Sequence, residues 1–473
     1  MAFHYPIFIA FATLFFAFWP LIRSTKNGRW AYITVASFFF YGWWDWRYLF
    51  LLGGSGLLDF GAGLGMQAYP RYKRFFLFSS LFGNLGSLIA FKYSKFLLAN
   101  LASFLAFLPF ETHFTPQIPE FMQILPVGIS FYTFQSLSYT IDIYRGQLQP
   151  TRNLLHFFAY LSMFPQLVAG PIVRATDLLP QLETYNIPKE EQRWAGLKLL
   201  IHGYFKKIVI ADNLAPQIKL AFSAATISNA TFFWWLITAA FAFQIYCDFS
   251  GYSDIARGLA KWMGYEFPVN FDHPYTATSF REFWTRWHIS LSTWFRDYLY
   301  IPLGGNHLGK WRSEINMWLT MILSGFWHGA SWNFIVWGML HALFLTFERF
   351  TQWPTRLKKL PGGRGIALFL VVLQVWLAWL FFRATNVEQA ISIIKTLFSF
   401  HGGGIDFEKY GYSWLIFLFL GISREIFVFW RFEPKLYLPK LWQNAIEISF
   451  EALIIVVCIY LRGPGSEFIY FQF

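Results

Sequence analysis

Apolar stretches recur along almost the whole chain and are separated by short polar or basic segments. The hydrocarbon core of a bilayer is about 30 Å thick, so a helix needs about 20 mostly apolar residues to cross it. We predict helices near 5–22, 31–46, 48–66, 76–94, 97–110, 122–144, 153–169, 194–212, 230–247, 313–334, 335–348, 365–382, 411–430 and 443–461. Some are too short to cross and are expected to be re-entrant or interfacial, which leaves about eleven crossings. The pattern predicts an all-α polytopic membrane protein with a single integral membrane domain over residues 1–473.

Composition supports lipid as the solvent for this chain. Hydrophobic residues make up 56% of the 473 residues, charged residues only 14%, and the mean hydropathy is +0.39. Soluble proteins carry about 25% charged residues. The net charge of +12 is not concentrated in a soluble module, so nucleic acid is not an expected partner. The run at 6–21 lacks a basic leader and a small-residue cleavage site, so we expect it to be a retained first helix.

Basic residues in the connecting segments predict an orientation, because Lys and Arg are enriched on the cytoplasmic side of membrane helices. Arg23, Lys26 and Arg29 place the first loop in the cytoplasm and the N-terminus outside. The basic segment 349–364 is again cytoplasmic. The order of the later spans then places the C-terminal tail, residues 463–473, at the outer face. We expect a multi-pass protein in the bilayer of a membrane.

The segment Phe280–Tyr298 is predicted as one amphipathic helix. Its aromatic and aliphatic residues recur at spacings of three and four. The opposite face carries polar and basic side chains, namely Arg281, Thr285, His288, Ser292 and Arg296. Such a helix can lie in the membrane interface, where the arginines contact lipid headgroups and His288 is one more polar residue. It can equally line a polar funnel within the protein.

His328 is predicted to lie in the middle of an apolar helix. Ser324 precedes it by one helical turn, and Ser331 and Trp332 follow it by one turn. A titratable group at membrane depth is costly and is therefore a functional candidate. An imidazole with a pKa near 6.5 is suited to removing the proton of a hydroxyl. The alternative is a structural histidine that forms a hydrogen bond between helices.

Asp248 is a second polar group within an apolar stretch, in the sequence YCDFSGYSDIARG. No His or Cys lies at metal-ligand spacing from it, and Cys247 and Cys458 lie in apolar surroundings, so we expect neither a metal site nor a disulfide framework. The pattern favours a structural hydrogen-bond network for Asp248, or the orientation of a histidine.

Several long motifs occur in one order: LPVGISFYTFQSLSYTIDIYRG, FPQLVAGPIVR, YCDFSGYSDIARGLA, NFDHPYTATSFREFWTRWHISLSTWFRDYLYIPLGGN and LSGFWHGASWNFIVWGMLHA. This set resembles the membrane-bound O-acyltransferase family, in particular its bacterial alginate O-acetyltransferase branch. That branch includes peptidoglycan O-acetyltransferases and is related to teichoic-acid D-alanyltransferases. The strong resemblance covers 125–343, which we expect to be the catalytic core. It implies the fold of the family, with helices around a central intramembrane cavity.

The resemblance assigns roles to particular residues. His328, in the WHG motif, matches the essential catalytic histidine of the family, and His288, in RWHISLS, matches a second required position. The last six residues, FIYFQF, resemble the C-terminal aromatic motif of the branch and make Tyr470 the expected acyl relay. The alternative for this tail is simple aromatic anchoring in the membrane interface. We expect substrate binding to involve further side chains near these positions, namely Arg281, Ser292, Arg296, Ser324, Trp332 and Asp248.

These roles imply transfer of an acyl group, expected to be acetyl, across the inner membrane of a bacterium. The donor would be a cytoplasmic thioester, either acetyl-CoA or an acyl carrier protein, and no bound cofactor is expected. His328 would deprotonate Tyr470, and a periplasmic or extracellular acetyltransferase partner would pass the acyl group to a polysaccharide. Alternatives are a D-alanyl or protein-directed acyltransferase of the same superfamily, and a transporter with the histidines as a proton relay. A transporter predicts two related halves, which the sequence does not show.

Overall fold

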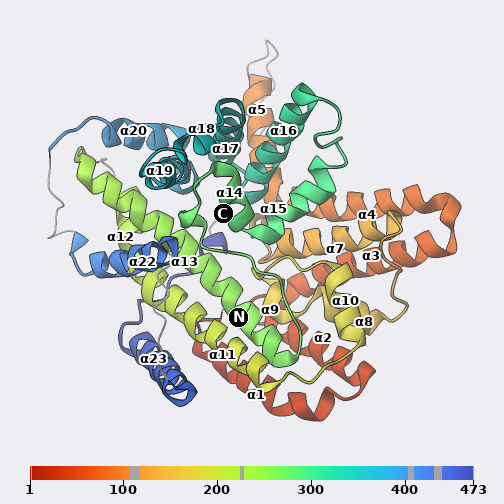
Figure 1. The fold of residues 1–473 in the computed structure, drawn as a ribbon. Coiled ribbons are helices and arrows are strands. Elements are labelled where there is room, and N and C mark those ends of the chain that lie inside the picture. Colours follow the sequence, from red (N-terminus) through yellow and green to blue (C-terminus); the bar gives the residue numbers. More distant parts are fainter. Residues whose placement is uncertain (2, 107–117, 224–227, 403–409, 431–438, 472–473) are drawn as a thin grey trace. The chain divides into compact units, whose positions relative to one another are not determined.

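Figure 1 shows the fold in a computed structural model, which describes residues 1, 3–106, 118–223, 228–402, 410–430 and 439–471. Every regular element in these ranges is helical, which confirms the all-α prediction there. The end of the predicted span 97–110 and the last two residues of the tail lie outside the described residues. Five helices in these ranges are long and apolar enough to cross a membrane: Trp46–Ala68, Pro70–Ala106, Thr231–Met263, Gly363–Arg383 and Lys440–Tyr460. The predicted number of about eleven crossings is not confirmed.

The first of two compact units comprises Met1–Gly196 and Leu259–Pro268. Its helices are α1 (Pro6–Ile22), α2 (Lys26–Gly42), α3 (Leu49–Ala68), α4 (Lys73–Leu88), α5 (Ser94–Ala106), α6 (Glu120–Gln123), α7 (Ile129–Tyr144), α8 (Leu154–Leu161), α9 (Phe164–Leu167) and α10 (Ala175–Glu183). A π-helical segment, Ile89–Tyr93, joins α4 to α5. The segment predicted at 76–94 and the described part of the one predicted at 97–110 therefore form one continuous helix, Pro70–Ala106. The segment predicted at 153–169 is instead two short helices, with a proline in the first turn of α9.

A basic residue of the first loop is buried in this unit. Arg29 on α2 is only 2% exposed. Its guanidinium donates hydrogen bonds to the carbonyl oxygens of Arg23 at 2.8 Å and Leu182 at 2.9 Å. Arg29 therefore caps the C-terminal ends of α1 and α10, in addition to contributing to the positive charge of the first loop. The predicted orientation of the chain in the membrane, with the N-terminus outside, stays a prediction.

The second unit comprises Leu197–Gly258 and Val269–Phe473. Its helices are α11 (Glu190–Tyr204, which begins before the unit), α12 (Asp212–Ser223), α13 (Thr231–Met263, which ends beyond it), α14 (Phe280–Arg286), α15 (Ile289–Phe295), α16 (Lys310–His328), α17 (Trp332–Thr351), α18 (Trp353–Leu357), α19 (Gly363–Arg383), α20 (Val387–Leu397), α22 (Trp414–Phe429), α23 (Lys440–Tyr460) and the 3-10 helix Ile469–Phe471. All the predicted site residues lie in this unit. The prediction of one domain over the whole chain stays a prediction.

The two segments around the histidines differ from their predicted form. Residues 280–298 are not one helix, because the chain breaks at His288, whose φ of 41° is left-handed. Two seven-residue helices, α14 and α15, result, followed by a π-helical turn over Arg296–Tyr300. His328 is not in mid-helix either. It is the last residue of α16, and α17 begins at Trp332.

Glycines let α16 and α17 form a close hairpin, and the two helices lie side by side in Figure 1. A Cβ on Gly325 would lie 2.2 Å from the carbonyl oxygen of Phe334, and one on Gly338 would lie 2.5 Å from that of Met321. These distances are too short for any side chain. Small residues that permit close helix contact are common in membrane proteins. Gly325 lies three residues before His328, so α17 approaches α16 closely beside this histidine.

Candidate active site

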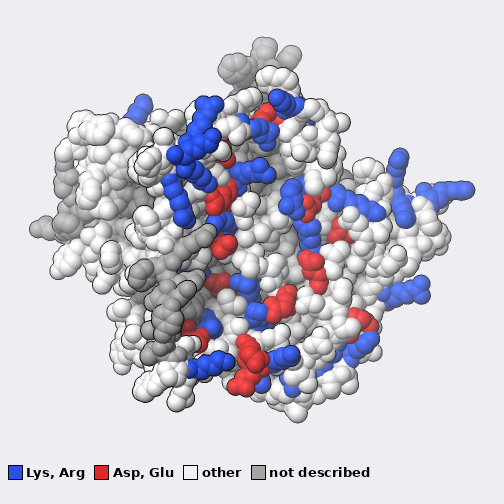
Figure 2. Space-filling view, viewed as in Figure 1, with Lys and Arg blue, Asp and Glu red and all other residues white. Residues whose placement is uncertain are grey.

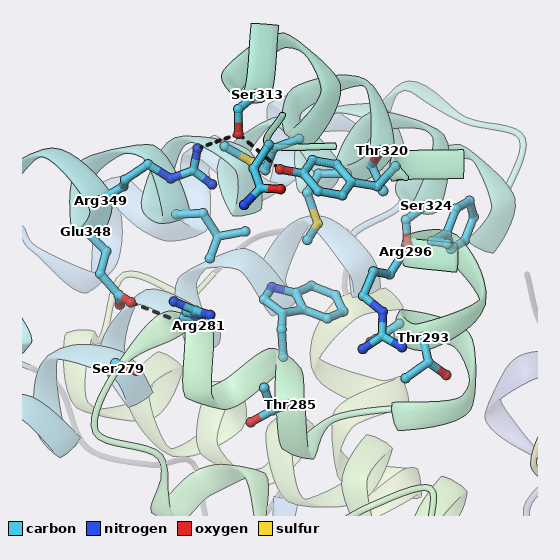
Figure 3. Close-up of a pocket in the computed structure, with 18 of the residues that line it drawn as sticks. Ser279, Arg281, Thr285, Thr293, Arg296, Ser313, Thr320, Ser324, Glu348 and Arg349 are labelled. Carbon is cyan, nitrogen blue, oxygen red and sulfur yellow. Dashed lines mark hydrogen bonds between the residues drawn. The ribbon is translucent and has the colours of Figure 1, made fainter. Parts of the chain in front are cut away.

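A large pocket opens among α14, α15, α16, α17 and α18 (Figure 3). Its volume is about 1070 Å³. The basic side chains that line it are Arg281, Arg296, His307, Arg349 and Lys358. Figure 2 shows Lys and Arg side chains gathered on the face where α14, α17 and α18 lie in Figure 1. A cavity with this lining attracts anionic groups such as phosphates.

Hydrogen bonds and ion pairs hold part of this lining in place. Glu348 accepts a hydrogen bond from the backbone N–H of Arg281 at 3.3 Å. Arg349 pairs with Glu314 at 2.6 Å and donates a hydrogen bond to Ser313 at 3.2 Å, the latter drawn in Figure 3. Arg296 pairs with its neighbour Asp297 at 2.6 Å. The cations of the pocket are therefore partly oriented before any ligand binds.

The predicted polar face is preserved despite the break in the helix. Arg281 and Thr285 on α14, Ser292 on α15 and Arg296 after it all line the pocket. His288 does not. The left-handed backbone at His288 turns this residue away from the other four, and its side chain is fully buried. The prediction that His288 shares their polar face is therefore wrong.

His288 is held by an asparagine that the sequence reasoning did not identify. Its Nδ1 lies 3.1 Å from Oδ1 of Asn270, which also accepts a hydrogen bond from the hydroxyl of Ser290 at 2.9 Å. The amide nitrogen of Asn270 donates to Ser253 at 3.1 Å. Because Asn270 Oδ1 is an acceptor, it favours the His288 tautomer with a proton on Nδ1. Burial lowers the pKa of His288 to about 3, so this imidazole is neutral at physiological pH.

His328 lies in an aromatic cage. It is 3% exposed. Its ring centroid lies 5.0 Å from that of Trp327, 5.2 Å from those of Trp337 and Phe382, and 5.6 Å from that of Tyr470. Trp337 is presented by α17, next to α16, and Phe382 by the end of α19. The cage fixes the position of the imidazole and excludes water from it.

Tyr470 brings the C-terminal tail into the same cage. Its ring is partly buried, its hydroxyl oxygen is buried, and the ring lies 4.4 Å from Phe249. Phe249 in turn contacts His288 edge-on, with ring centroids 4.6 Å apart. The two histidines therefore approach the same tyrosine, His328 directly and His288 through Phe249.

The remaining predicted binding residues divide into two groups. Ser324 lines the pocket and lies one helical turn before His328 on α16. Trp332 is 57% exposed, and neither it nor Asp248 is among the pocket residues. Asp248 instead lies 2.8 Å from Lys207. Among the residues that the structure describes, no group of three or more His, Cys, Asp or Glu side chains could hold a metal ion.

Asn270, Phe249 and a third buried histidine were missed. His341 on α17 is fully buried, with its ring 4.2 Å from Trp337 and 5.0 Å from Trp284 of the pocket. The sequence carried a signal for each, since Asn270 opens the motif NFDHPY, Phe249 adjoins Asp248, and His341 is the second-last residue of the motif that contains His328. The three residues come from three separate segments, so only tertiary packing brings Asn270 and Phe249 to His288 and His341 to Trp284.

Comparison with known proteins gives a consistent result. The model of the membrane-bound O-acyltransferase family matches residues 147–390, a range that contains both histidines but not the tail. A probable alginate O-acetylase from Pseudomonas putida is 38% identical over 375 residues, covering 78% of this chain and 74% of its own. A peptidoglycan O-acetyltransferase from Helicobacter pylori is 36% identical over 435 residues, covering 85% and 80%. A teichoic acid D-alanyltransferase from Bacillus subtilis is more distant, at 29% identity over 279 residues, covering 56% and 69%.

Proposed function

This chain belongs to the membrane-bound O-acyltransferase family, and on that premise we propose that it acetylates a cell-envelope or exported polysaccharide through Tyr470. The O-acyltransferase activity follows from the family. The similarity to alginate O-acetylases and to a peptidoglycan O-acetyltransferase supports an alginate-like polymer or peptidoglycan as the final acceptor. The donor, the catalytic residues and the partners are parts of the proposal.

The contact between His328 and Tyr470 carries this proposal. Their ring centroids lie 5.6 Å apart in a cage of aromatic residues, and the hydroxyl oxygen of Tyr470 is buried. Burial raises the pKa of Tyr470 above its usual value of about 10. The phenol therefore stays protonated until a base removes its proton during attack. An imidazole beside it is suited to that task.

The transfer step is a substitution at a thioester. His328 takes the phenolic proton as the oxygen of Tyr470 attacks the carbonyl carbon of the acetyl thioester. The bond from this carbon to sulfur then breaks, and the leaving thiolate takes the proton from the imidazolium of His328. The products are an acetyl ester of Tyr470 and a free thiol, and the histidine returns to its neutral form.

The pocket supports binding of a phosphate-bearing donor. Both acetyl-CoA and an acyl carrier protein carry their thioester on a phosphopantetheine chain. Arg281 and Arg296 are placed to bind phosphate groups, and Ser324 lies on the path along α16 towards His328. His288 is neutral, and its Nδ1 proton faces Asn270. Its Nε2 therefore carries a lone pair and no proton, so we assign His288 to positioning the donor and not to stabilising the thioester oxyanion.

The protein is proposed to act across a bacterial inner membrane. The charge pattern of the loops supports a cytoplasmic donor side and an outer location for both the N-terminus and the tail. The acetylated tyrosine would then face an acetyltransferase partner in the periplasm or outside the cell. This partner would take the acetyl group from Tyr470 and transfer it to a polysaccharide hydroxyl.

Purified full-length protein in lipid nanodiscs tests the proposal. It is incubated with radiolabelled acetyl-CoA or an acetylated acyl carrier protein, and the label is located by peptide mass spectrometry. We expect label on Tyr470, lost in Tyr470→Phe and His328→Ala. The matched control is Tyr460→Phe, since Tyr460 is 81% exposed at the end of α23 and should not affect labelling.

Three outcomes would contradict parts of the proposal. Labelling of Tyr470 in His328→Ala would refute the assignment of His328 as the general base. Unchanged polymer acetylation in cells that carry Tyr470→Phe would refute the relay. Reaction with a D-alanyl carrier and not with an acetyl donor would replace acetyl by D-alanyl, the group named for the more distant relative.

A further inference from the structure

A lysine is buried between two carboxylates in the second unit. The Nζ of Lys207 lies 2.9 Å from Asp212 and 2.8 Å from Asp248, and none of the three side chains is more than 2% exposed. Lys207 lies in the π-helical segment Phe205–Ala211, Asp212 begins α12, and Asp248 is in the middle of α13. Gly203 on α11 and Gly251 on α13 let the backbones of these two helices approach closely beside the ion pairs. A Cβ on either would lie within 2.8 Å of the carbonyl oxygen of the other.

The backbone of the C-terminal tail forms hydrogen bonds with two of these three charged side chains, Lys207 and Asp248. Lys207 donates to the carbonyl oxygen of Ser466 at 3.0 Å, and the N–H of Ile469 donates to Asp248 at 2.8 Å. Burying a charge is costly unless it is paired and hydrogen-bonded. The peptide groups of the tail therefore supply hydrogen bonds that water would supply to the same charges at a protein surface.

The start of the tail is fixed beside the same cluster. The N–H of Gly463 donates to the carbonyl oxygen of Ile208 at 2.8 Å, and Asn213 donates to that of Leu461 at 2.9 Å. A Cβ on Gly463 would lie 2.7 Å from the carbonyl carbon of Asp212. Only glycine permits the tail to approach the start of α12 this closely.

Tyr470 is the residue that follows this anchored backbone. Ile469 is held by Asp248, and Phe468 stacks on the tyrosine with ring centroids 5.7 Å apart. From this anchored backbone, the ring of Tyr470 extends to Phe249, with ring centroids 4.4 Å apart, and to His328, with centroids 5.6 Å apart. The position of the Tyr470 ring relative to His328 therefore depends on the contacts that Lys207, Asp248 and Gly463 make with the tail backbone.

We propose that Lys207, Asp212 and Asp248 form a clamp on the tail backbone and act as positioning residues that seat Tyr470 against His328. The clamp touches neither donor nor acetyl group. It rests on the proposed function in one respect, namely that the tyrosine it seats is the acceptor of the acetyl group. Loss of the clamp should leave the donor pocket intact but move the acceptor, Tyr470, away from the base, His328.

Photo-crosslinking of the full-length protein in its membrane tests the position of the tail directly. The residue at 470 is replaced by p-benzoylphenylalanine, and peptides of α13 and α16 crosslinked to it are quantified by mass spectrometry. We expect the yield to fall at least fivefold in Lys207→Met, Asp248→Ala and Gly463→Ala. Gly463→Ala retains all three charges, so its effect does not depend on an unpaired buried charge.

Two further variants make the test specific. Asp248→Asn keeps an oxygen that accepts the N–H of Ile469, so its crosslink yield should lie between those of the parent and Asp248→Ala. Glu467→Gln alters an exposed tail residue and should leave the yield unchanged. A yield unchanged in both Lys207→Met and Gly463→Ala would overturn the clamp.

Acetylation kinetics separate this proposal from the proposed function. In clamp variants that retain Tyr470, kcat for its acetylation should fall at least tenfold while KM for acetyl-CoA stays within twofold, because the donor pocket is unchanged. A tenfold rise in KM with kcat unchanged would contradict a positioning role. If Tyr470 is not acetylated in the parent protein, the relay fails, and the crosslink yields still decide whether the clamp holds the tail.

Discussion

The ring of His328, at the end of α16, lies 5.6 Å from the ring of Tyr470, in the C-terminal tail. This contact joins a motif in the core of the family match to a residue outside that match. It places an imidazole beside the ring of a tyrosine in a cage of aromatic side chains. The chemistry of this pair gives the first prediction.

Replacement of His328 by alanine should lower the rate of Tyr470 acetylation by roughly 10²–10⁴-fold, the usual contribution of a general base. The measurement is single-turnover transfer of label from acetyl-CoA at saturating donor. KM for the donor should change little, because the basic lining of the pocket is untouched. A fall of less than threefold would remove His328 from the proton transfer.

Replacement of Arg281 or Arg296 by glutamine should raise KM for acetyl-CoA about tenfold each. A hydrogen bond to a charged group is worth about 1.5–3 kcal/mol, and about 1.4 kcal/mol corresponds to a factor of ten. The effect should shrink at high salt, which screens the remaining cations. Arg356→Gln is the control, because Arg356 is exposed on α18 and does not line the pocket. Equal KM values for all three variants would argue against phosphate binding here.

Folding stability should fall as the pH drops below about 6.5, and His288 should contribute to this fall. The folded state keeps His288 neutral, since burial lowers its pKa to about 3, whereas the unfolded chain protonates it near 6.5. The unfolded state thus binds more protons in this window, and acid favours it by up to about 1.4 kcal/mol per pH unit from this residue. Thermal unfolding midpoints between pH 6.5 and 4.5 should fall less steeply in His288→Asn.

The exposed His307 provides the matched control for that measurement. His307→Asn makes the same substitution at an exposed position of the pocket and so controls for the change of side chain itself. If His288→Asn and His307→Asn have the same slope, His288 is not held neutral by burial.

Gly338→Ala should destabilise the protein by about 1–3 kcal/mol, the usual cost of overpacking. The new Cβ would lie 2.5 Å from the carbonyl oxygen of Met321, so α17 must move away from α16 and carry Trp337 away from His328. Both the unfolding midpoint and the acetylation rate should fall. Gly365→Ala in α19 is the control, since nothing lies within 4 Å of the added Cβ and its effect should stay within about 1 kcal/mol. Equal midpoints in the two variants would show that the hairpin tolerates the extra carbon.

The sequence determined the class of the protein and the candidate chemistry. Apolar runs need lipid or a large core around them, so hydropathy alone predicted an all-helical membrane protein, and motif order pointed to the acyltransferase family. Arg281, Thr285, Ser292 and Arg296, which the spacing assigned to one polar face, all line the pocket, although the helix predicted to carry them is broken at His288.

Only the tertiary structure decided which side chains meet. Periodicity assigned His288 to the polar face, but a left-handed φ, stabilised by contacts with Asn270, buries it instead. The position of Tyr470 beside His328 depends on Lys207 and Asp248, which lie far from both in sequence. Periodicity reports how a segment presents its own faces. The partners of a buried charge or ring come from segments that lie at no fixed distance along the chain, so only the folded structure shows which ones they are.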